Sequence, residues 1–228
     1  MANSQQLSMN RNEKKALKKA KILDAAWTIF GRNGYTGASL DAVAEEAGVS
    51  KPTLYMYFGN KEGLFEALLT DASEEILGPL FESASNETSM VQAFVNFGRT
   101  YAEIVLSERV LSLGRLVIGE ATRFPEIGEK YYMAGPDKAH EGIQTWLEHL
   151  AAEGQLSIDD AELAGHDFWS LILSAPREMM QIMPNKKMEQ AEIDRFIFNG
   201  LRIFLKGYST NASADLKELQ ILKQATLD

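Results

Sequence analysis

The stretch from Phe30 to Phe65, FGRNGYTGASLDAVAEEAGVSKPTLYMYFGNKEGLF, decides how this sequence folds. It contains three interruptions rich in glycine, serine or asparagine, and the residues between them include apolar positions three and four apart. That spacing is typical of helices packed on a core, and the interruptions carry residues that end and begin helices. The stretch therefore predicts the end of one helix, two short helices and the start of a fourth helix.

The predicted helix ends follow from local backbone chemistry. Gly34 is expected to end a first helix that runs from about Glu13 to Arg32, because glycine tolerates a left-handed backbone. Ser39 is placed to cap the second helix with its side-chain oxygen. Gly48 allows a tight turn, and the third helix begins at Ser50 with Pro52 in its first turn. Two short helices joined by such a turn predict a helix-turn-helix, in which the second helix reads DNA.

The third helix is expected to expose DNA-contacting side chains near its N-terminus. Lys51 could reach a guanine edge or a phosphate, and the tyrosine hydroxyls suit phosphates. An exposed amphipathic surface is the alternative, but tyrosines beside lysines after a turn motif favour DNA contact. Tyr57 could instead pack against the first helix, and Ser39 could serve only as a cap. The predicted DNA-binding residues are Ser39, Lys51, Pro52, Thr53, Tyr55, Met56, Tyr57 and Lys61.

The charge distribution separates this region from the rest of the chain. The 228 residues carry a net charge of -9, which by itself argues against a nucleic-acid binder. Residues 1–61, however, hold nine lysines and arginines against five acidic residues, and the remainder holds fourteen against twenty-seven. The sequence therefore predicts two domains: an N-terminal arm with a helix-turn-helix at 1–61, and an acidic domain at 62–228.

Helical periodicity continues beyond the predicted DNA-binding domain, with breaks at intervals. No segment alternates with a period of two for long enough to predict a strand. The predicted fold class is all-α, with a three-helix DNA-binding domain followed by a helical bundle for dimerisation and ligand binding. For the last twenty residues, an appended helix and disorder both remain open. The breaks fall near Asn86, at Phe124–Pro125, at Gly135–Pro136, at Glu153–Gly154 and at Met183–Asn185.

One segment is apolar nearly all round, from Phe168 to Ala175. Such a helix needs burial on more than one side, and a second subunit could supply one of these sides. Pro176, directly after this segment, predicts a kink in the same helix. The predicted dimer interface comprises Phe168, Leu171, Ile172, Ala175, Phe196, Gly200 and Phe204.

Aromatic and methionine residues of the acidic domain could line an apolar ligand pocket, although the same residues at helical spacing are more often plain core. The charged Arg115 and Glu120 stand in an otherwise apolar helix, where they could anchor a ligand or form salt bridges. The candidate pocket residues are Phe94, Phe97, Tyr101, Arg115, Glu120, Trp146, Trp169 and Met180.

Several kinds of chemistry are excluded or disfavoured. The chain has no cysteine, so disulfides and thiolate chemistry are excluded, and a cytoplasmic location is expected. The polar, basic N-terminus has no secretory signal pattern, and no apolar run is long enough for a membrane span. Three scattered histidines predict no metal site, and no catalytic arrangement can be identified, so we expect neither an enzyme nor a cofactor.

The motifs of the opening stretch resemble the DNA-binding domain of TetR-type transcriptional repressors. The resemblance covers roughly fifty residues and rests on Phe30-x-x-x-Gly34-Tyr35, Ala47-Gly-Val-Ser50, Leu54-Tyr-x-Tyr-Phe58 and Lys61-Glu-x-Leu64. The segments 115–126, 131–136 and 154–160 are similar to the C-terminal domain of the AefR-like branch of that family.

This resemblance implies a homodimer that binds a double-stranded, palindromic DNA operator. It also implies a C-terminal domain that takes up a small effector, expected to be apolar, and thereby changes the spacing of the two DNA-binding domains. A regulator that has no small ligand and whose body binds another protein is the alternative. A helical small-molecule carrier is a third possibility.

Overall fold

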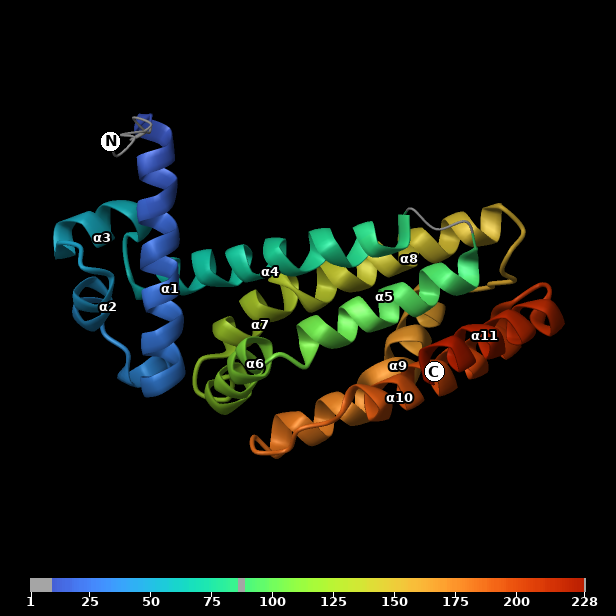
Figure 1. The fold of residues 1–228 in the computed structure, drawn as a ribbon. Helices are drawn as coiled ribbons and strands as arrows, with labels where there is room; N and C mark the ends of the chain where they lie inside the picture. The colour runs from blue at the N-terminus through green and yellow to red at the C-terminus, as the bar shows by residue number, and fades with distance from the viewer. Residues whose placement is uncertain (1–9, 86–88, 228) are drawn as a thin grey trace, which may run out of the picture.

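The computed structural model describes residues 10–85 and 89–227, and these residues are helical almost throughout, without a strand (Figure 1). An isolated β-bridge joins Leu156 and Ser209. The all-α fold class is confirmed. The helices are α1 Arg11–Gly37, α2 Leu40–Ala47, α3 Lys51–Phe58, α4 Lys61–Ser85, α5 Met90–Val105, α6 Glu108–Glu120, α7 Pro125–Ala134, α8 Pro136–Ala152, α9 Ala161–Ile182, α10 Gln190–Tyr208 and α11 Ala212–Leu227.

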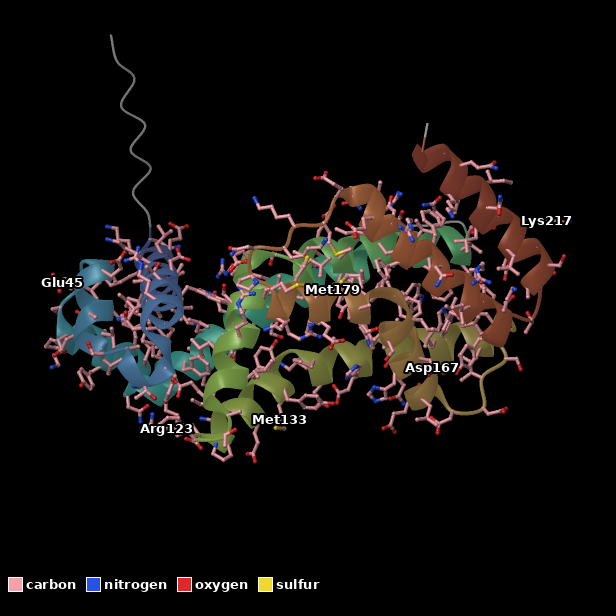
Figure 2. All side chains as sticks on the ribbon, turned by 90° about the horizontal axis from the view of Figure 1, so that it is seen from below. Glu45, Arg123, Met133, Asp167, Met179 and Lys217 are labelled. Carbon is pink, nitrogen blue, oxygen red and sulfur yellow. The ribbon has the colours of Figure 1, made fainter. Side chains whose placement is uncertain are left out.

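Helices α1 to α3 form a head at one end of an elongated molecule, and α5 to α11 form the body (Figure 1 and Figure 2). The long helix α4 leads from the head into the body, where it packs against α5. Helix α10 lies against α9, α5 and α11. The C-terminal segment is therefore an appended helix, and its Leu219 is buried against the body core.

The predicted turns of the head are confirmed. The backbone at Gly34 has a φ of 68° and interrupts α1, and Gly48 adopts the left-handed conformation with φ 60° and ψ 39°. The hydroxyl of Ser39 accepts a hydrogen bond from the Ala42 N–H at 3.1 Å. Ser50 stands at the N-cap of α3, but its Oγ pairs with the Thr53 Oγ1 at 2.8 Å and not with a backbone N–H. The predicted breaks of the body also coincide with helix ends.

The hydrophobic core of the head continues into the body. Buried residues of α1, such as Ile22 and Phe30, pack with Leu64 and Phe65 at the start of α4. The same cluster includes Leu113, Val117 and Ile127 of α6 and α7. The head therefore shares one core with the first part of the body, and this core extends past residue 61.

The body has a second core in which α9 is central. Gly200 of α10 lies so close to α9 that a Cβ atom there would approach the Leu171 carbonyl oxygen to 2.3 Å. The apolar segment of α9 is thus covered by α10 and other helices of the same chain. Pro176 lies buried inside α9, which continues to Ile182.

This packing corrects part of the predicted dimer interface. Phe168, Ile172, Gly200 and Phe204 are buried within a single chain, so they do not face a partner. The prediction was wrong for these four because the second apolar side of the helix meets its own chain. Ala175 is exposed, whereas Leu171 and Phe196 are partly exposed, and these three stay available for a subunit contact.

Candidate functional site

The outer face of α3 is open to solvent. Leu54 is fully buried and holds the helix on the head core, whereas Lys51, Pro52, Tyr55 and Met56 are exposed. Tyr55 is 44% exposed and Met56 is 73% exposed, which is high for large side chains with apolar bodies. Half of the residues predicted from sequence to contact DNA therefore lie together on one accessible helix face.

Lys51 has an acidic neighbour on α2. Its Nζ lies 2.7 Å from Asp41 Oδ1, and the hydrogen bond to this carboxylate raises the pKa of Lys51. The side chains of both residues are more than half exposed. Exposed ion pairs contribute little to stability, so a phosphate could replace Asp41 as the partner at small cost.

Three other predicted residues are partly engaged in the fold. Thr53 and Tyr57 are partly buried, and the Tyr57 ring packs against Phe58 at a centroid distance of 6.0 Å. The Ser39 hydroxyl caps α2, as described above. A cap can also donate its hydroxyl proton to a phosphate, so this geometry leaves the DNA contact of Ser39 as a prediction.

Lys61, at the start of α4, holds the C-terminal end of α1. Its Nζ donates hydrogen bonds to the carbonyl oxygens of Tyr35 at 2.7 Å, Thr36 at 3.3 Å and Ala38 at 3.1 Å. It also lies 4.6 Å from the centroid of the Tyr35 ring. An ammonium group has three protons, and all three have a carbonyl partner in this geometry.

We therefore expect Lys61→Met to destabilise the protein and to leave the salt dependence of DNA binding unchanged. Losing hydrogen bonds from a charged donor to carbonyls at a helix end is expected to cost about 2 kcal/mol. Urea denaturation measures the first effect, and operator affinity against salt concentration measures the second. Lys19→Met, at an exposed position of α1, is the stability control. A salt slope reduced by about one phosphate contact per subunit would instead support the contact predicted from sequence.

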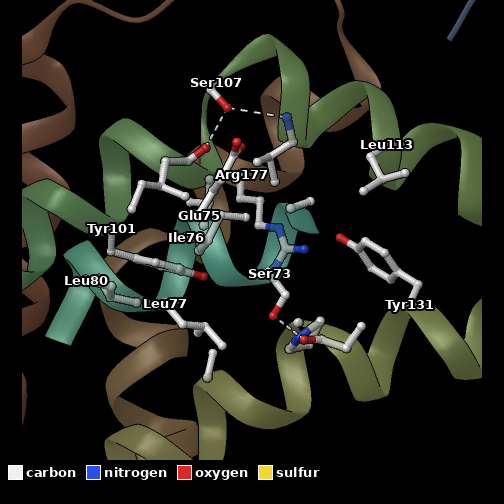
Figure 3. A pocket seen from close by; sticks show the side chains of 18 of the residues that line it. Ser73, Glu75, Ile76, Leu77, Leu80, Tyr101, Ser107, Leu113, Tyr131 and Arg177 are labelled. Atoms are coloured by element: carbon white, nitrogen blue, oxygen red, sulfur yellow. Dashed lines mark hydrogen bonds between the residues drawn. The ribbon is translucent and has the colours of Figure 1, made fainter. Parts of the chain in front are cut away.

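A cavity of about 440 Å³ lies in the body next to the head (Figure 3). Residues of α1 and of α4 to α9 form its wall, which is mainly apolar. Of the eight candidate pocket residues, Tyr101 and Trp169 line this cavity. The other six do not.

Four of these six belong to the solid core. The ring of Phe94 lies 5.0 Å from the ring of Trp146, which in turn lies 5.3 Å from the ring of Phe97. Met180 packs against the same core. Pocket lining was the wrong prediction for these residues because their side chains pack into the core between the helices.

The two charged candidates make structural contacts. Arg115 donates a hydrogen bond to the Met180 carbonyl at 3.2 Å and is paired with Glu108. Glu120 accepts hydrogen bonds from the Thr36 N–H at 3.2 Å and from the Thr36 Oγ1 at 3.0 Å. Glu120 therefore links α6 of the body to the end of α1 in the head.

The polar residues that do line the cavity were missed by sequence reasoning. They include Trp27 of α1, Ser73 of α4, His140 of α8 and Arg177 of α9. No local pattern marks these positions, because each comes from a different helix and their proximity depends on the tertiary packing. The end of the apolar segment of α9 was the one available signal for Arg177, which follows it by two residues.

Comparisons with known proteins agree with this architecture. Residues 22–68 match the family described as bacterial regulatory proteins, tetR family. Residues 92–210, more than half of the chain, match the AefR-like transcriptional repressor, C-terminal domain. The chain belongs to the TetR family.

Individual relatives support the assignment. The transcriptional regulator RutR of Escherichia coli K12 is 41% identical over 70 residues, which cover 31% of this chain and 33% of RutR. YvkB, an uncharacterized regulator of Bacillus subtilis, is 31% identical over 114 residues, which cover 46% of this chain and 59% of YvkB. The matches thus span less than two thirds of these relatives' own lengths.

Two solved structures extend the similarity to the whole fold. A putative TetR-family regulator from Mesorhizobium loti has a TM-score of 0.79 and 25% identity, and the match covers 89% of this chain and all of that chain. The flavonoid-responsive regulator FrrA has a TM-score of 0.71 and 28% identity, with 86% and 98% covered.

The protein is therefore a TetR-family transcriptional regulator and not an enzyme. Among the described residues, no group of histidine and acidic side chains could hold a metal ion. No helix in the same ranges is long and apolar enough to cross a membrane.

Proposed function

We propose that this TetR-family protein is a repressor that binds a palindromic operator as a homodimer and is released by a small effector. The cavity would be the effector site, and α3 would read the operator. The observation that carries the proposal is that one wall of the cavity is Trp27, a residue of the head helix α1. An occupant of the cavity would therefore contact the head, which carries the proposed DNA-reading helix, directly through α1.

The exposed face of α3 supports the DNA-binding part of the proposal. Lys51, Pro52 and Tyr55 lie at the accessible N-terminal turns, from which a recognition helix contacts base edges and phosphates. Helix α1 adds the exposed lysines Lys14, Lys15, Lys18 and Lys19, which suit the DNA backbone. The net positive charge of the head and the acidic body favour an approach of DNA to α3.

The contacts between head and body support the regulatory part. The Arg109 guanidinium of α6 lies 4.6 Å from the centroid of the Trp27 ring, and Glu120 of the same helix holds Thr36. Lys130 of α7 bridges Glu62 and Glu66 of α4 at 2.9 and 2.8 Å. The head is thus attached to helices that form the cavity wall, so a shift of these helices on ligand binding would turn the head.

The second copy would pack against the outer faces of α9 and α10. Ala175 and Ile203 are exposed there, and Leu171 and Phe196 are partly exposed. A symmetric dimer would present two α3 helices about 34 Å apart, which matches one turn of DNA. An effector that prefers a dimer with another spacing would lower the operator affinity, by no more than its differential affinity for the two states.

The cavity favours this function over a regulator whose body binds only a protein partner. Its volume of about 440 Å³ lies within the range of small-molecule sites, which is about 300–1,000 Å³. A ligand-independent regulator would have no need for such a space next to its DNA-binding head.

In vitro selection of random DNA duplexes with the purified protein tests the proposal. We expect enrichment of a palindrome with half-sites about one helical turn apart, and footprinting should show both half-sites protected. Light scattering of the protein with the selected duplex should give two chains per duplex or a multiple of two. Enrichment of no sequence, or of a single non-repeated half-site bound by one chain, would contradict the proposal.

A further inference from the structure

The cavity contains a positive charge without a counterion. Figure 3 shows the Arg177 side chain reaching into the space between Tyr101 and Tyr131, above Ser73. Arg177 is partly buried, and among the described residues no carboxylate lies within 4.0 Å of its guanidinium. The other arginine of the wall, Arg109, lies 3.5 Å from Glu75 and so has an acidic partner. The cavity therefore carries one uncompensated guanidinium group.

Other polar atoms of the wall also lack partners. The buried side-chain nitrogens without a hydrogen bond in the described part of the chain are Trp27 Nε1, Trp169 Nε1 and His140 Nδ1, and all three residues line this cavity. Two of the three are indole N–H groups, which can only donate. Burial, His166 and Arg177 lower the pKa of His140, so this ring is neutral at neutral pH and adds no positive charge of its own. The wall therefore offers two unpaired indole donors and one guanidinium without an acidic partner, whereas its carboxylate, Glu75, is already paired with Arg109.

Most of the remaining wall is apolar or aromatic. Leu77 and Leu173 line the cavity together with Tyr101 and Trp169. Burial raises the pKa of the Tyr101 hydroxyl, which stays protonated as a further donor. An occupant would need an apolar body for these surfaces and a single anionic acceptor group for Arg177.

We propose that the cavity binds a small organic acid whose carboxylate pairs with Arg177 and whose apolar, partly aromatic body fills the rest of the space. A planar guanidinium binds a carboxylate through two parallel hydrogen bonds, which gives both affinity and orientation. The inference rests on the proposed function, because it specifies the effector of that same site. It adds a charge to the effector, which the sequence predicted to be apolar.

Matched acid and amide pairs test the charge requirement. The probes are naphthylacetic, cinnamic and decanoic acids, each compared with its own primary amide, which has the same body without the charge. Isothermal titration is carried out on the full chain without DNA. We expect at least one acid to bind roughly ten- to hundredfold more tightly than its amide, as a hydrogen bond to a charged group implies.

Arginine variants test which positive charge causes the preference for the acid over its amide. Arg177→Met is expected to remove the preference for the acid while the amide keeps its affinity, which shows that the variant still has a formed cavity. Arg195→Met removes an exposed arginine of α10 outside the cavity and is expected to keep the preference. Arg177→Lys should keep part of the preference for the acid over the amide.

The inference is overturned if no acid binds the folded wild-type protein at millimolar concentration, or if acids and amides bind equally. It is also overturned if Arg177→Met keeps the preference. These readouts do not involve DNA, so they are separate from the operator selection that tests the proposed function. A protein that enriches a palindrome but shows no acid preference would keep its function and lose this inference.

Discussion

Tyr55→Ala is expected to weaken operator binding by about 30- to 1,000-fold. The Tyr55 side chain is 44% exposed on the outer face of α3, where its hydroxyl is placed to donate to a phosphate and its ring to pack on the DNA backbone. Losing these contacts should cost about 1–2 kcal/mol at each half-site, and a dimer loses them twice. Fluorescence anisotropy with the selected duplex at fixed salt measures the change.

The matched control for this variant is Tyr132→Ala. Tyr132 lies on α7 in the body and is similarly exposed, at 47%, so the substitution removes the same atoms from a position far from α3 in the sequence. We expect Tyr132→Ala to keep wild-type affinity, and both variants to keep the wild-type melting temperature. Tyr55→Phe separates the hydroxyl from the ring. An affinity of Tyr55→Ala within threefold of wild type, at unchanged stability, would remove α3 from the proposed DNA interface.

The head could be predicted from sequence because its signals are local. Ser39 caps a helix that begins at the next residue, and Gly48 and Gly59 have positive φ at the ends of α2 and α3. Each of these features depends on a few consecutive residues and on the backbone freedom of glycine. The ends of the body helices could be predicted for the same reason.

The cavity could not be predicted because its geometry is tertiary. Tyr101 of α5 and Arg177 of α9 meet only after the body has folded, and Trp27 reaches the same cavity from the head. The positions of Arg115 and Glu120 on one helix suggested a common role, yet one bonds to α9 and the other to the end of α1. Helical spacing predicts on which face of a helix a residue lies. It does not predict which other element packs against that face.

The dimer interface could not be predicted fully from sequence for a related reason. An all-round apolar helix must be covered on several sides, but its sequence does not distinguish its own chain from a partner. In this fold α10 approaches α9 at Gly200, so Phe168 and Ile172 are covered from within. The outer faces of the same two helices, with Ala175 and Ile203, then become the better candidates for a subunit contact.

Phe97→Ala is expected to lower the free energy of unfolding by about 3–5 kcal/mol. The side chain has no exposed surface, and its ring lies within 6 Å of four other rings: those of Phe81, Trp146, Phe168 and Trp169. Removing the ring leaves a space that these fixed helices cannot close, so both the transfer energy and the packing contacts are lost. The melting temperature should fall by about 6–20 °C for a chain of this length.

The size of this loss in the free energy of unfolding tests whether Phe97 belongs to the packed core or lines the pocket, as the sequence predicted. A ring that lined an open cavity would have fewer neighbours to lose, and its removal would enlarge an existing space without creating a new one. Leu163→Ala, on the same body but 60% exposed, should change stability by less than about 0.5 kcal/mol. Urea denaturation followed by circular dichroism measures both variants. A loss below about 1 kcal/mol for Phe97→Ala, far under the range for a buried aromatic ring, would mean that the aromatic cluster is not the packed core described above.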